Sequence, residues 1–428
     1  MAVSAKYAQI HLRYNFIVNL CDGGFWGFGI GFASFVTVIP LFVSHFTDSA
    51  ILIGLIPAIH AAGWQLPQLL LADRVARAER YKPMVLWLTM VERLPFLGFG
   101  LVALSYPILP REIALGLTYG LLIVQGLGSG LTATPWQSLI AKIIPPAQRG
   151  TFFGAQAAAA NLLASVSALG AGILLDQFVL PLNFALVFTL AFAAMMVSFV
   201  FLARTRESAA PPESTGLAQR DFRGGLTAIL QRDVNFRWFL VVRVLFHLAT
   251  MAFAFYTIYA VRQHQVSVVV TGVLTSVYLG SQIVANPVMG WVGDRWGHRV
   301  VLQFGALAAV GSTALAIWAP SAEWFYAVFT LAGISNVAAW TITMTMTIDF
   351  AGDPTERPAY VGLANTLVAP FAILAPLLGG WFADAMGYAS AFIVSAFGGL
   401  LAWLVLRALI HDPRARDLGR ASVGRSLE

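Results

Sequence analysis

Long stretches of apolar residues recur along the chain, separated by short polar segments. The stretch from Phe184 to Leu202 shows no alternation of polar and apolar positions, which argues against the strands of a membrane β-barrel. The stretches reach about 20 residues, the length that an α-helix needs to cross the hydrocarbon core of a bilayer. The pattern predicts an all-α membrane protein with twelve transmembrane helices, at residues 14–43, 49–72, 82–106, 111–142, 147–176, 182–203, 234–263, 268–292, 299–319, 323–350, 357–386 and 388–410.

The composition favours the same class of protein. Of the 428 residues, 58% are hydrophobic and 11% are charged, whereas a soluble domain carries about 25% charged residues. The single cysteine, Cys21, lies in the first apolar stretch, so no intramolecular disulfide and no thiolate metal site is expected. That stretch is too long for the core of a signal peptide, and we interpret it as a retained helix.

The basic residues predict the orientation of the chain, because cytoplasmic loops of membrane proteins retain Lys and Arg. All but four of the 26 basic residues fall on one side of the twelve-helix map. Arg111 and Arg262 fall on the other side, and Arg93 and Arg243 lie inside predicted helices. We therefore expect a multi-pass protein of the cell (inner) membrane with both termini in the cytoplasm. The net charge of +6 is scattered over short loops, which argues against nucleic acid as a partner.

One connecting segment is much longer and more polar than the others. Residues 204–233 contain many Arg, Asp, Glu and Pro residues, a composition that cannot bury itself. We predict an N-terminal six-helix bundle at 1–203, a cytoplasmic linker at 204–233, a C-terminal six-helix bundle at 234–411 and a cytoplasmic tail at 412–428.

The two predicted halves resemble each other in sequence. Ala72-Asp73-Arg74 follows the second span, and Gly293-Asp294-Arg295 follows the eighth. The loops after the fourth and tenth spans share a proline and an arginine, seen in Pro146 with Arg149 and in Pro354 with Arg357. These matches predict a duplication, and internal repeats with a substrate site at their interface are typical of secondary transporters.

One loop carries a longer motif. The sequence Gly290-Trp-Val-Gly-Asp294-Arg295-Trp-Gly297-His-Arg299 resembles the loop signature of the major facilitator superfamily. The first-half copy keeps Asp73, Arg74 and Arg77 but has Leu69 and Ala76 at the positions of the family's glycines. The resemblance covers nearly the whole chain and implies a major facilitator fold of two pseudo-symmetric six-helix bundles.

The resemblance also implies a role for the motif. In the family it acts as a cytoplasmic gate that holds one state and opens during alternating access. A small residue lets a neighbouring helix come close, and the aspartate can meet helix N-terminal amides and nearby arginines. The alternative is that these residues only fix the geometry of the loop. The glycine-proline element of the family's antiporters is absent from 167–172, and a similar sequence occurs at 375–380 instead, so symport and antiport both stay open.

Four charged residues stand out well inside predicted spans, where each charge costs about 2.5 to 3.5 kcal/mol on insertion scales. Asp22 lies in the first span, Glu92 and Arg93 in the third, and Arg243 in the seventh. Because neighbouring residues point about 100° apart on a helix, we expect Glu92 and Arg93 to have separate partners. The resemblance implies that the first and seventh spans line a central cavity.

Two interpretations of these charges are open. In the first, Asp22 binds a proton or cation, and Arg243 attracts an anionic group of the substrate or pairs with Asp22 in the empty site. In the second, Asp22 and Arg93 form a permanent structural ion pair. For Glu92 a structural role is favoured.

Further cavity candidates are neutral or titratable side chains near the middle of the predicted spans. His247 follows Arg243 by four residues and shares its helical face, whereas His60 is interpreted as a packing residue. Gln125, Asn336 and Trp340 are the other candidates. Aromatic residues at helical spacing in the first and seventh spans suit an amphipathic or aromatic substrate, although packing against lipid explains them too.

Together these features predict a secondary active transporter that moves a small organic solute by alternating access. Coupling to a proton or another cation is expected, because the chain has no Gly-x-x-x-x-Gly-Lys-Ser/Thr motif for nucleotide binding. The alternative is a non-transporting membrane sensor or scaffold with the same fold. An enzyme is not expected, because the seven histidines are too dispersed to form a catalytic cluster. We expect no cofactor and no metal site, membrane lipids and a small-molecule substrate as partners, and a monomeric state.

Overall fold

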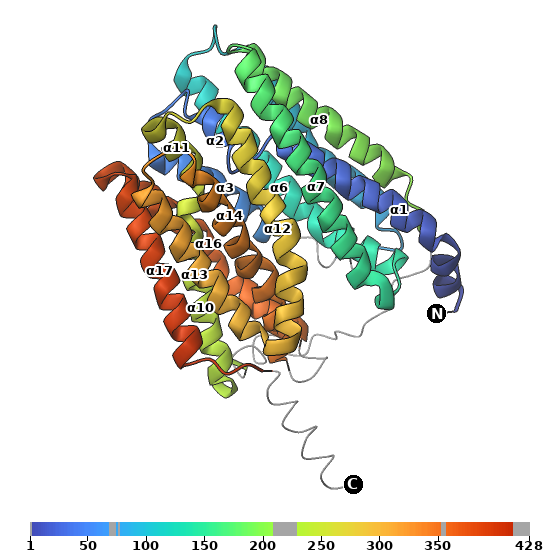
Figure 1. Cartoon of the computed structure of the whole chain (residues 1–428). Coiled ribbons are helices and arrows are strands. Elements are labelled where there is room, and N and C mark those ends of the chain that lie inside the picture. Colours follow the sequence, from blue (N-terminus) through green and yellow to red (C-terminus); the bar gives the residue numbers. More distant parts are fainter. Residues whose placement is uncertain (1, 68–73, 76–77, 209–228, 352–356, 414–428) are drawn as a thin grey trace. The chain divides into compact units, whose positions relative to one another are not determined.

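Most of the chain that the structure describes is helical. The computed structural model describes residues 2–67, 74–75, 78–208, 229–351 and 357–413 (Figure 1), and its described part contains helices and connecting turns but no strand. The first half contains α1 (Ala2–Phe32), α2 (Val38–Val43), α3 (Ala50–Gln65), α5 (Lys82–Leu104), α6 (Arg111–Ile143), α7 (Pro146–Gln177) and α8 (Leu182–Ala203).

The second half contains helices of three kinds. The α-helices are α10 (Val234–Thr250), α11 (Tyr256–His264), α12 (Val268–Trp296), α13 (His298–Trp318), α14 (Trp324–Val337), α15 (Thr343–Phe350), α16 (Arg357–Met386) and α17 (Tyr388–Ala408), with a short 3₁₀ helix η2 (Met251–Ala254) and a π-helical turn η3 (Ala338–Ile342). Each of the twelve predicted spans overlaps one or more of these helices, and residues 68–72 of the predicted span 49–72 lie outside the described part of the chain. Among the described residues, ten helices are long and apolar enough to cross a membrane, and α3 is a shorter apolar helix.

Three predicted helices are interrupted in the structure. The predicted helix 14–43 ends at Phe32 and resumes as α2 after a turn in which Ser34 Oγ accepts hydrogen bonds from the amides of Val36 and Thr37. The predicted helix 234–263 is divided by η2, and the predicted helix 323–350 by η3. The prediction was wrong at these points because apolar residues continue through each break.

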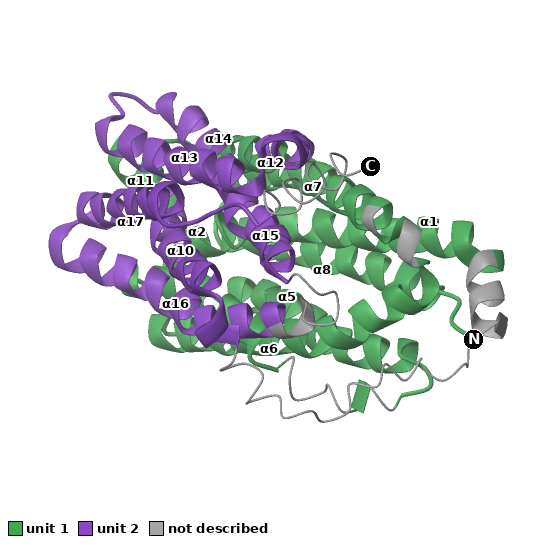
Figure 2. Cartoon of the chain, turned by 90° about the horizontal axis from the view of Figure 1, so that it is seen from below, with its two compact units in different colours: residues 1–216, 257–280 green, residues 217–256, 281–428 purple. Residues whose placement is uncertain are grey.

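The helices group into two compact units (Figure 2). Unit 1 consists of residues 1–216 and 257–280, and unit 2 of residues 217–256 and 281–428. The segment 257–280 lies in the predicted C-terminal bundle but packs with the first half of the chain. Within unit 1, Arg262 Nη2 lies 2.8 Å from Asp48 Oδ1, and Thr257 Oγ1 donates a hydrogen bond of 3.0 Å to the Val36 carbonyl.

The two halves use the same order of helix pairs, as the predicted duplication requires. In unit 1, α1 packs along α7 and α8, and α5 packs along α6 and α8. In unit 2, α10 packs along α16 and α17, and α13 packs along α14 and α17. These pairs occupy corresponding positions in the two sets of six spans.

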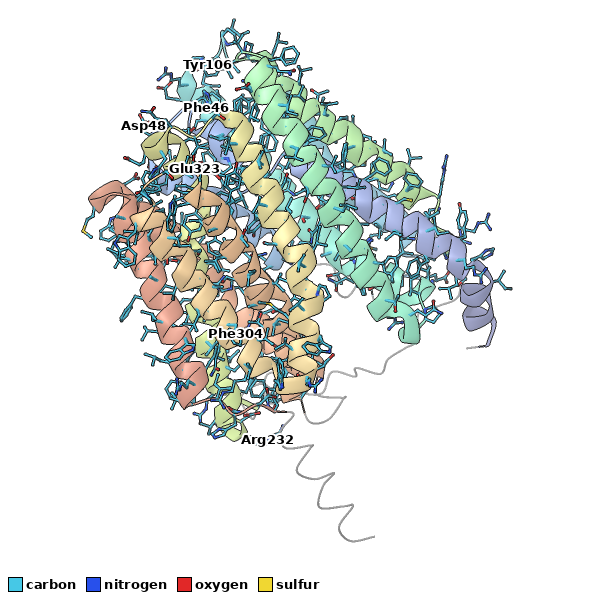
Figure 3. The ribbon with its side chains drawn as sticks, viewed as in Figure 1. Phe46, Asp48, Tyr106, Arg232, Phe304 and Glu323 are labelled. Atoms are coloured by element: carbon cyan, nitrogen blue, oxygen red, sulfur yellow. The ribbon has the colours of Figure 1, made fainter. Side chains whose placement is uncertain are left out.

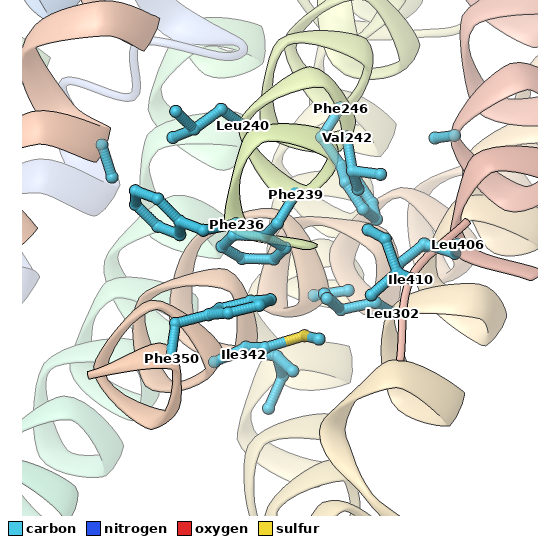
Figure 4. Close-up of a cluster of buried hydrophobic side chains, with 14 of the residues drawn as sticks. Phe236, Phe239, Leu240, Val242, Phe246, Leu302, Ile342, Phe350, Leu406 and Ile410 are labelled. Atoms are coloured by element: carbon cyan, nitrogen blue, oxygen red, sulfur yellow. The ribbon is translucent and has the colours of Figure 1, made fainter. Parts of the chain in front are cut away.

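The core of unit 2 is aromatic and aliphatic. Phe236, Phe239 and Phe246 of α10 are buried among Leu302 of α13 and Phe350 of α15 (Figure 4). Outward positions are also apolar, as expected where lipid is the solvent. Phe304 of α13, for example, which is labelled in Figure 3, is 61% exposed. This pattern of apolar outer faces identifies a multi-pass membrane protein.

Candidate functional site

A buried ion pair joins α1 and α5 in unit 1. Arg93 Nη2 lies 3.5 Å from Asp22 Oδ1, and both side chains are almost fully buried. Of the two sequence interpretations, the structure therefore contains the contact between Asp22 and Arg93. Arg93 Nε also donates a hydrogen bond of 3.0 Å to the Met195 carbonyl of α8. Several acceptors lower the free-energy cost of burying a guanidinium, because each donated hydrogen bond offsets part of its lost hydration.

Ser198 of α8 connects the two members of this ion pair. Its hydroxyl donates a hydrogen bond of 2.6 Å to Asp22 Oδ1 and accepts one of 2.9 Å from Arg93 Nη2. The indole of Trp26 covers the guanidinium, with Arg93 Cζ 5.1 Å from the ring centroid. Arg93 Nη1 is buried without a hydrogen-bond partner in the described part of the chain. The two N–H donors of this nitrogen therefore have no acceptor among the described residues.

Glu92 is the second carboxylate of the site. It is buried, and the hydroxyl of Ser129 of α6 forms a hydrogen bond with its carboxylate. The charges of Arg93 and Asp22 are close enough to act on it. Glu92, Arg93 and Asp22 thus form one electrostatic cluster with two carboxylates and one guanidinium, and an unbalanced charge in a buried site favours uptake of a proton or a cation.

This cluster lines a cavity of about 450 Å³ within unit 1. Its walls also carry three indole rings, Trp26, Trp64 and Trp136, and the small polar side chains of Thr89 and Thr132. A volume of this order, mostly apolar walls and a few convergent polar groups are the ordinary features of a small-molecule site.

Gln125 lies in unit 1 but is absent from the lining of this cavity. Its Oε1 lies 3.4 Å from His60 Nδ1, and the His60 ring packs on Phe35 with centroids 4.4 Å apart. His60 is thus a packing histidine with a polar partner. Gln125 Nε2 is buried without a hydrogen-bond partner among the described residues.

In unit 2, Arg243 of α10 contacts neutral acceptors. Its Nη2 donates a hydrogen bond of 3.1 Å to Asn365 Oδ1 of α16, and its Nη1 lies 3.5 Å from Thr347 Oγ1 of α15. In the part of unit 2 that the structure describes, no carboxylate forms an ion pair with Arg243. Its positive charge is therefore available to an anionic group.

The remaining candidates lie near Arg243 along the chain or in neighbouring helices. His247 packs edge-on against Trp340 with ring centroids 5.9 Å apart, and Trp340 is half exposed in the π-helical turn η3. Asn336 Nδ2 donates a hydrogen bond of 3.3 Å to Gln282 Oε1 of α12. Trp340 and His247 thus form an aromatic pair on the same unit as Arg243.

The motif at 290–299 forms a tight connection between α12 and α13. Gly297 has φ +93°, and a Cβ on it would lie 2.2 Å from Asp412 Oδ2, so only glycine fits. Arg299 donates hydrogen bonds to the carbonyls of Leu406 and Arg407, both of 2.8 Å, and His298 Nδ1 lies 2.7 Å from Asp349 Oδ2. These contacts show that motif residues fix the geometry of the connection between α12 and α13, which is the role considered in the sequence analysis as the alternative to a gate.

Other positions of the predicted gate contribute less packing. No described atom lies within 4 Å of a Cβ built on Gly290. Arg295 covers the ring of Trp291, with Cζ 5.7 Å from the centroid, and Asp294 belongs to the end of the same helix α12. In the first-half copy Arg74 is exposed, while Asp73 and Arg77 lie outside the described residues.

A family model for the Major Facilitator Superfamily matches the chain twice, at residues 91–267 and 248–426. The chain belongs to the Major Facilitator Superfamily. The two adjoining matches cover most of the sequence.

Curated members of the superfamily are similar to part of the chain. An uncharacterized MFS-type transporter of Schizosaccharomyces pombe is 27% identical over 146 residues, 34% of this chain and 32% of that protein. The vesicular acetylcholine transporter of Mus musculus is 28% identical over 142 residues, 33% of this chain and 27% of that protein. The alignments thus span about a third of these relatives.

Solved structures of superfamily transporters share the fold over nearly the whole chain. A nucleoside transporter, NupG, has a TM-score of 0.73 at 10% identity, covering 93% of this chain and 100% of the other. A D-xylose-proton symporter has a TM-score of 0.71 at 14% identity, covering 93% and 98%. These likenesses show the major facilitator fold.

Sequence reasoning missed several of the residues that complete these sites. Ser198 and Ser129 are small polar residues in apolar stretches, and nothing in their spacing distinguishes them from packing serines. Asn365 was detectable as an amide inside the eleventh predicted span. His298 and Asp349 are two charged or titratable residues at the ends of predicted spans, and their pairing depends on tertiary structure.

Proposed function

We propose that the protein is a secondary active transporter that moves a small organic solute by alternating access, coupled to protons or another cation. The observation that carries the proposal is the cavity in unit 1, where two buried carboxylates and one guanidinium meet three tryptophans. A purely structural ion pair has no need of a cavity, and a purely apolar binding site has no need of a second carboxylate.

The walls of the cavity support an amphipathic or aromatic solute. Trp26, Trp64 and Trp136 offer flat apolar faces, which bind aromatic rings by stacking and organic cations through their π-electrons. Glu92, which is held by a neutral hydroxyl, is the carboxylate best placed to meet a cationic group of a solute. Arg243 in unit 2 is proposed to attract an anionic group. The mouse relative named for acetylcholine is consistent with a cationic solute.

The charge of the cluster supports coupling to an ion. With Arg93 charged, the cluster carries one negative charge in excess if both carboxylates are ionised, and a buried excess charge is costly. Binding of one proton or cation at Asp22 or Glu92 removes the excess. A cationic solute would then compete with the proton for the excess negative charge. A neutral solute would instead bind together with the proton.

The orientation and organisation of the chain belong to the same proposal. We propose that it resides in the cell membrane as a monomer with both termini in the cytoplasm. We also propose that the two six-helix bundles at 1–203 and 234–411 are the moving parts, and that residues 73–77 and 290–299 form the gate. The distribution of basic residues supports the orientation, and the repeated order of helix packing supports the two bundles.

The test is transport by the purified protein in liposomes that contain a pH-sensitive dye. Solutes are first chosen by thermal-shift screening of metabolites and drugs at two pH values. Addition of a bound solute to wild-type vesicles should move protons, and Asp22→Asn should reduce proton flux at least about tenfold while solute still binds. Asp176→Asn is the matched control, because Asp176 is exposed at the end of α7.

Two results would contradict the proposal. If no bound solute shows counterflow with the wild type, the chain is a sensor or scaffold. If Asp22→Asn and Glu92→Gln both leave the coupling between proton and solute flux unchanged, the cluster is a permanent structural pair.

A further inference from the structure

A second cavity lies in unit 1, apart from the proposed transport site. It has a volume of about 590 Å³ and lies where the N-terminus of α5 meets the end of α8. Four basic side chains line it, Arg80, Lys82, Arg204 and Arg206. These residues belong to the side of the helices that carries nearly all the basic residues, which is the side that we propose to be cytoplasmic.

The acidic residue of this lining is already paired. Glu207 accepts hydrogen bonds from the amides of Tyr81 (2.8 Å) and Lys82 (2.9 Å) and forms a 3.0 Å ion pair with Lys142 Nζ. Its side chain is 2% exposed, and burial together with this carboxylate raises the pKa of the Tyr81 phenol. Glu207 therefore fixes the wall of the cavity and contributes little negative charge to its interior.

The basic residues differ in how far they are engaged. Lys82 Nζ donates to the Thr205 carbonyl at 2.9 Å, and the guanidinium of Arg206 lies over the Tyr14 ring at 4.2 Å. Arg80 and Arg204 are exposed, and in the described part of the chain neither forms an ion pair with a carboxylate. Two free guanidinium groups at the mouth of one cavity suit a phosphate, which arginine binds through paired hydrogen bonds.

The apolar side of the same cavity points to a lipid. Leu86 and Trp87 are large apolar residues of the lining, and Trp87 is 80% exposed on α5, a helix long and apolar enough to cross a membrane. Trp87 follows Lys82 by five residues, or about 7.5 Å along a helix axis. Exposed tryptophan one to two turns below a basic cluster is the arrangement found at the interface of bilayer and water.

We propose that this cavity binds the phosphate of an acidic phospholipid, with the acyl chains lying along α5 beside Trp87. A soluble phosphate ion shares the headgroup chemistry but would make no use of Leu86 and Trp87. A zwitterionic phospholipid carries the same phosphate, but its ammonium group would meet four basic side chains. Basic pockets at the cytoplasmic ends of membrane helices take anionic lipid headgroups for this reason.

The experiment is native mass spectrometry of the full-length protein in detergent, titrated with phosphatidylglycerol or with phosphatidylcholine of the same acyl chains. The wild type should retain phosphatidylglycerol in preference to phosphatidylcholine. Arg80→Gln combined with Arg204→Gln should weaken phosphatidylglycerol binding about 30-fold, at the usual contribution of a basic residue near an anionic lipid surface. Trp87→Ala should weaken binding of both lipids.

The matched control combines Arg237→Gln of α10 with Arg407→Gln of α17. Both arginines are exposed, and the double variant loses the same charge in unit 2. It should retain phosphatidylglycerol as the wild type does. Equal loss in the two double variants would overturn the proposal, because binding would then follow net charge alone. Displacement of phosphatidylglycerol by millimolar inorganic phosphate, with no effect of Trp87→Ala, would also overturn it and assign the site to a free anion.

Discussion

A single hydroxyl determines the geometry of the buried charges in unit 1. Ser198 bonds both Asp22 and Arg93, whereas the direct contact between those two residues is longer, at 3.5 Å. A serine hydroxyl can donate one bond while it accepts another, so it serves an anion and a cation together. The site therefore depends on a residue with no charge of its own.

Replacing Ser198 tests this dependence. Ser198→Ala should lower the free energy of unfolding by about 1 to 3 kcal/mol, because it leaves one acceptor of Asp22 and one donor of Arg93 without their partner. Denaturant titration in detergent measures the change. Ser138→Ala is the control, since among the described residues the Ser138 hydroxyl donates a hydrogen bond to the Thr134 carbonyl of its own helix and to no other group. Equal losses in the two variants would contradict the role given to Ser198.

At this scale the sequence indicated the charged residues but left their pairing open. Asp22, Glu92 and Arg93 were detectable because a charge inside an apolar stretch is costly and rare. The 100° between neighbouring residues of a helix correctly separated the partners of Glu92 and Arg93. The choice of Arg93 as the partner of Asp22 depends on the packing of α1 against α5 and α8, which apolar periodicity does not specify.

At the scale of helices, one close contact brings two backbones together inside unit 1. A Cβ on Gly172 of α7 would lie 2.8 Å from the Val269 carbonyl oxygen, and one on Gly272 of α12 would lie 2.5 Å from the Ala168 carbonyl oxygen. Small residues allow such approaches in membranes, where packing rather than water drives helix association. The glycines of 167–172, which lack the proline of the antiporter element, thus have a packing role.

Enlarging this contact should separate the helices. Gly172→Leu should destabilise the protein by about 1 to 3 kcal/mol, the usual cost of overpacking, and the fall is measured as a lower midpoint of thermal unfolding in detergent. Gly154→Leu provides the control on the same helix, because no atom of the described residues lies within 4 Å of a Cβ at that position. A similar fall for Gly154→Leu would show that the effect comes from the helix and not from the contact.

The lengths of the helices were predictable, but their interruptions were not. The turn at Ser34, the 3₁₀ segment after Thr250 and the π-helical turn at Ala338 all lie in continuous apolar sequence. The length of an apolar stretch predicts how many residues lie in the lipid. It does not predict whether the backbone hydrogen bonds of those residues follow an α, 3₁₀ or π pattern. The caps at soluble ends, such as Asp233 before α10, follow ordinary sequence signals.

At the scale of the whole molecule, the placement of basic residues predicts an orientation that can be measured. In a Cys21→Ser background, cysteines at positions 74 and 295 should react with an impermeant maleimide from the same side of the membrane. A cysteine at position 111 should react from the opposite side, since Arg111 begins α6 at the other end of the helices. Labelling of 74 and 295 from opposite sides would contradict both the orientation and the duplication.

The family was predictable from the loop motif at 290–299, because the motif fixes the spacing of several glycine, aspartate and arginine residues at once. The fold followed from the family and from twelve apolar stretches, and structures at 10% to 14% identity share it. The assignment of 257–280 to the first unit could not be read from the sequence, because it depends on contacts such as Thr257 with Val36.

The π-helical turn η3 changes the phase of the tenth span. Asn336 and Thr347 are eleven positions apart, which on an unbroken α-helix is about three full turns and would point both along one line. The π-helical turn holds one extra residue, which rotates Thr347 relative to Asn336 about the helix axis. Asn336 therefore contacts Gln282 of α12, while Thr347 contacts Arg243 of α10. Deleting one residue from 338–342 would remove the wide turn and leave Thr347 facing the cation that it now contacts, because ten positions on a regular α-helix advance by nearly the same angle as eleven positions that include the wide turn.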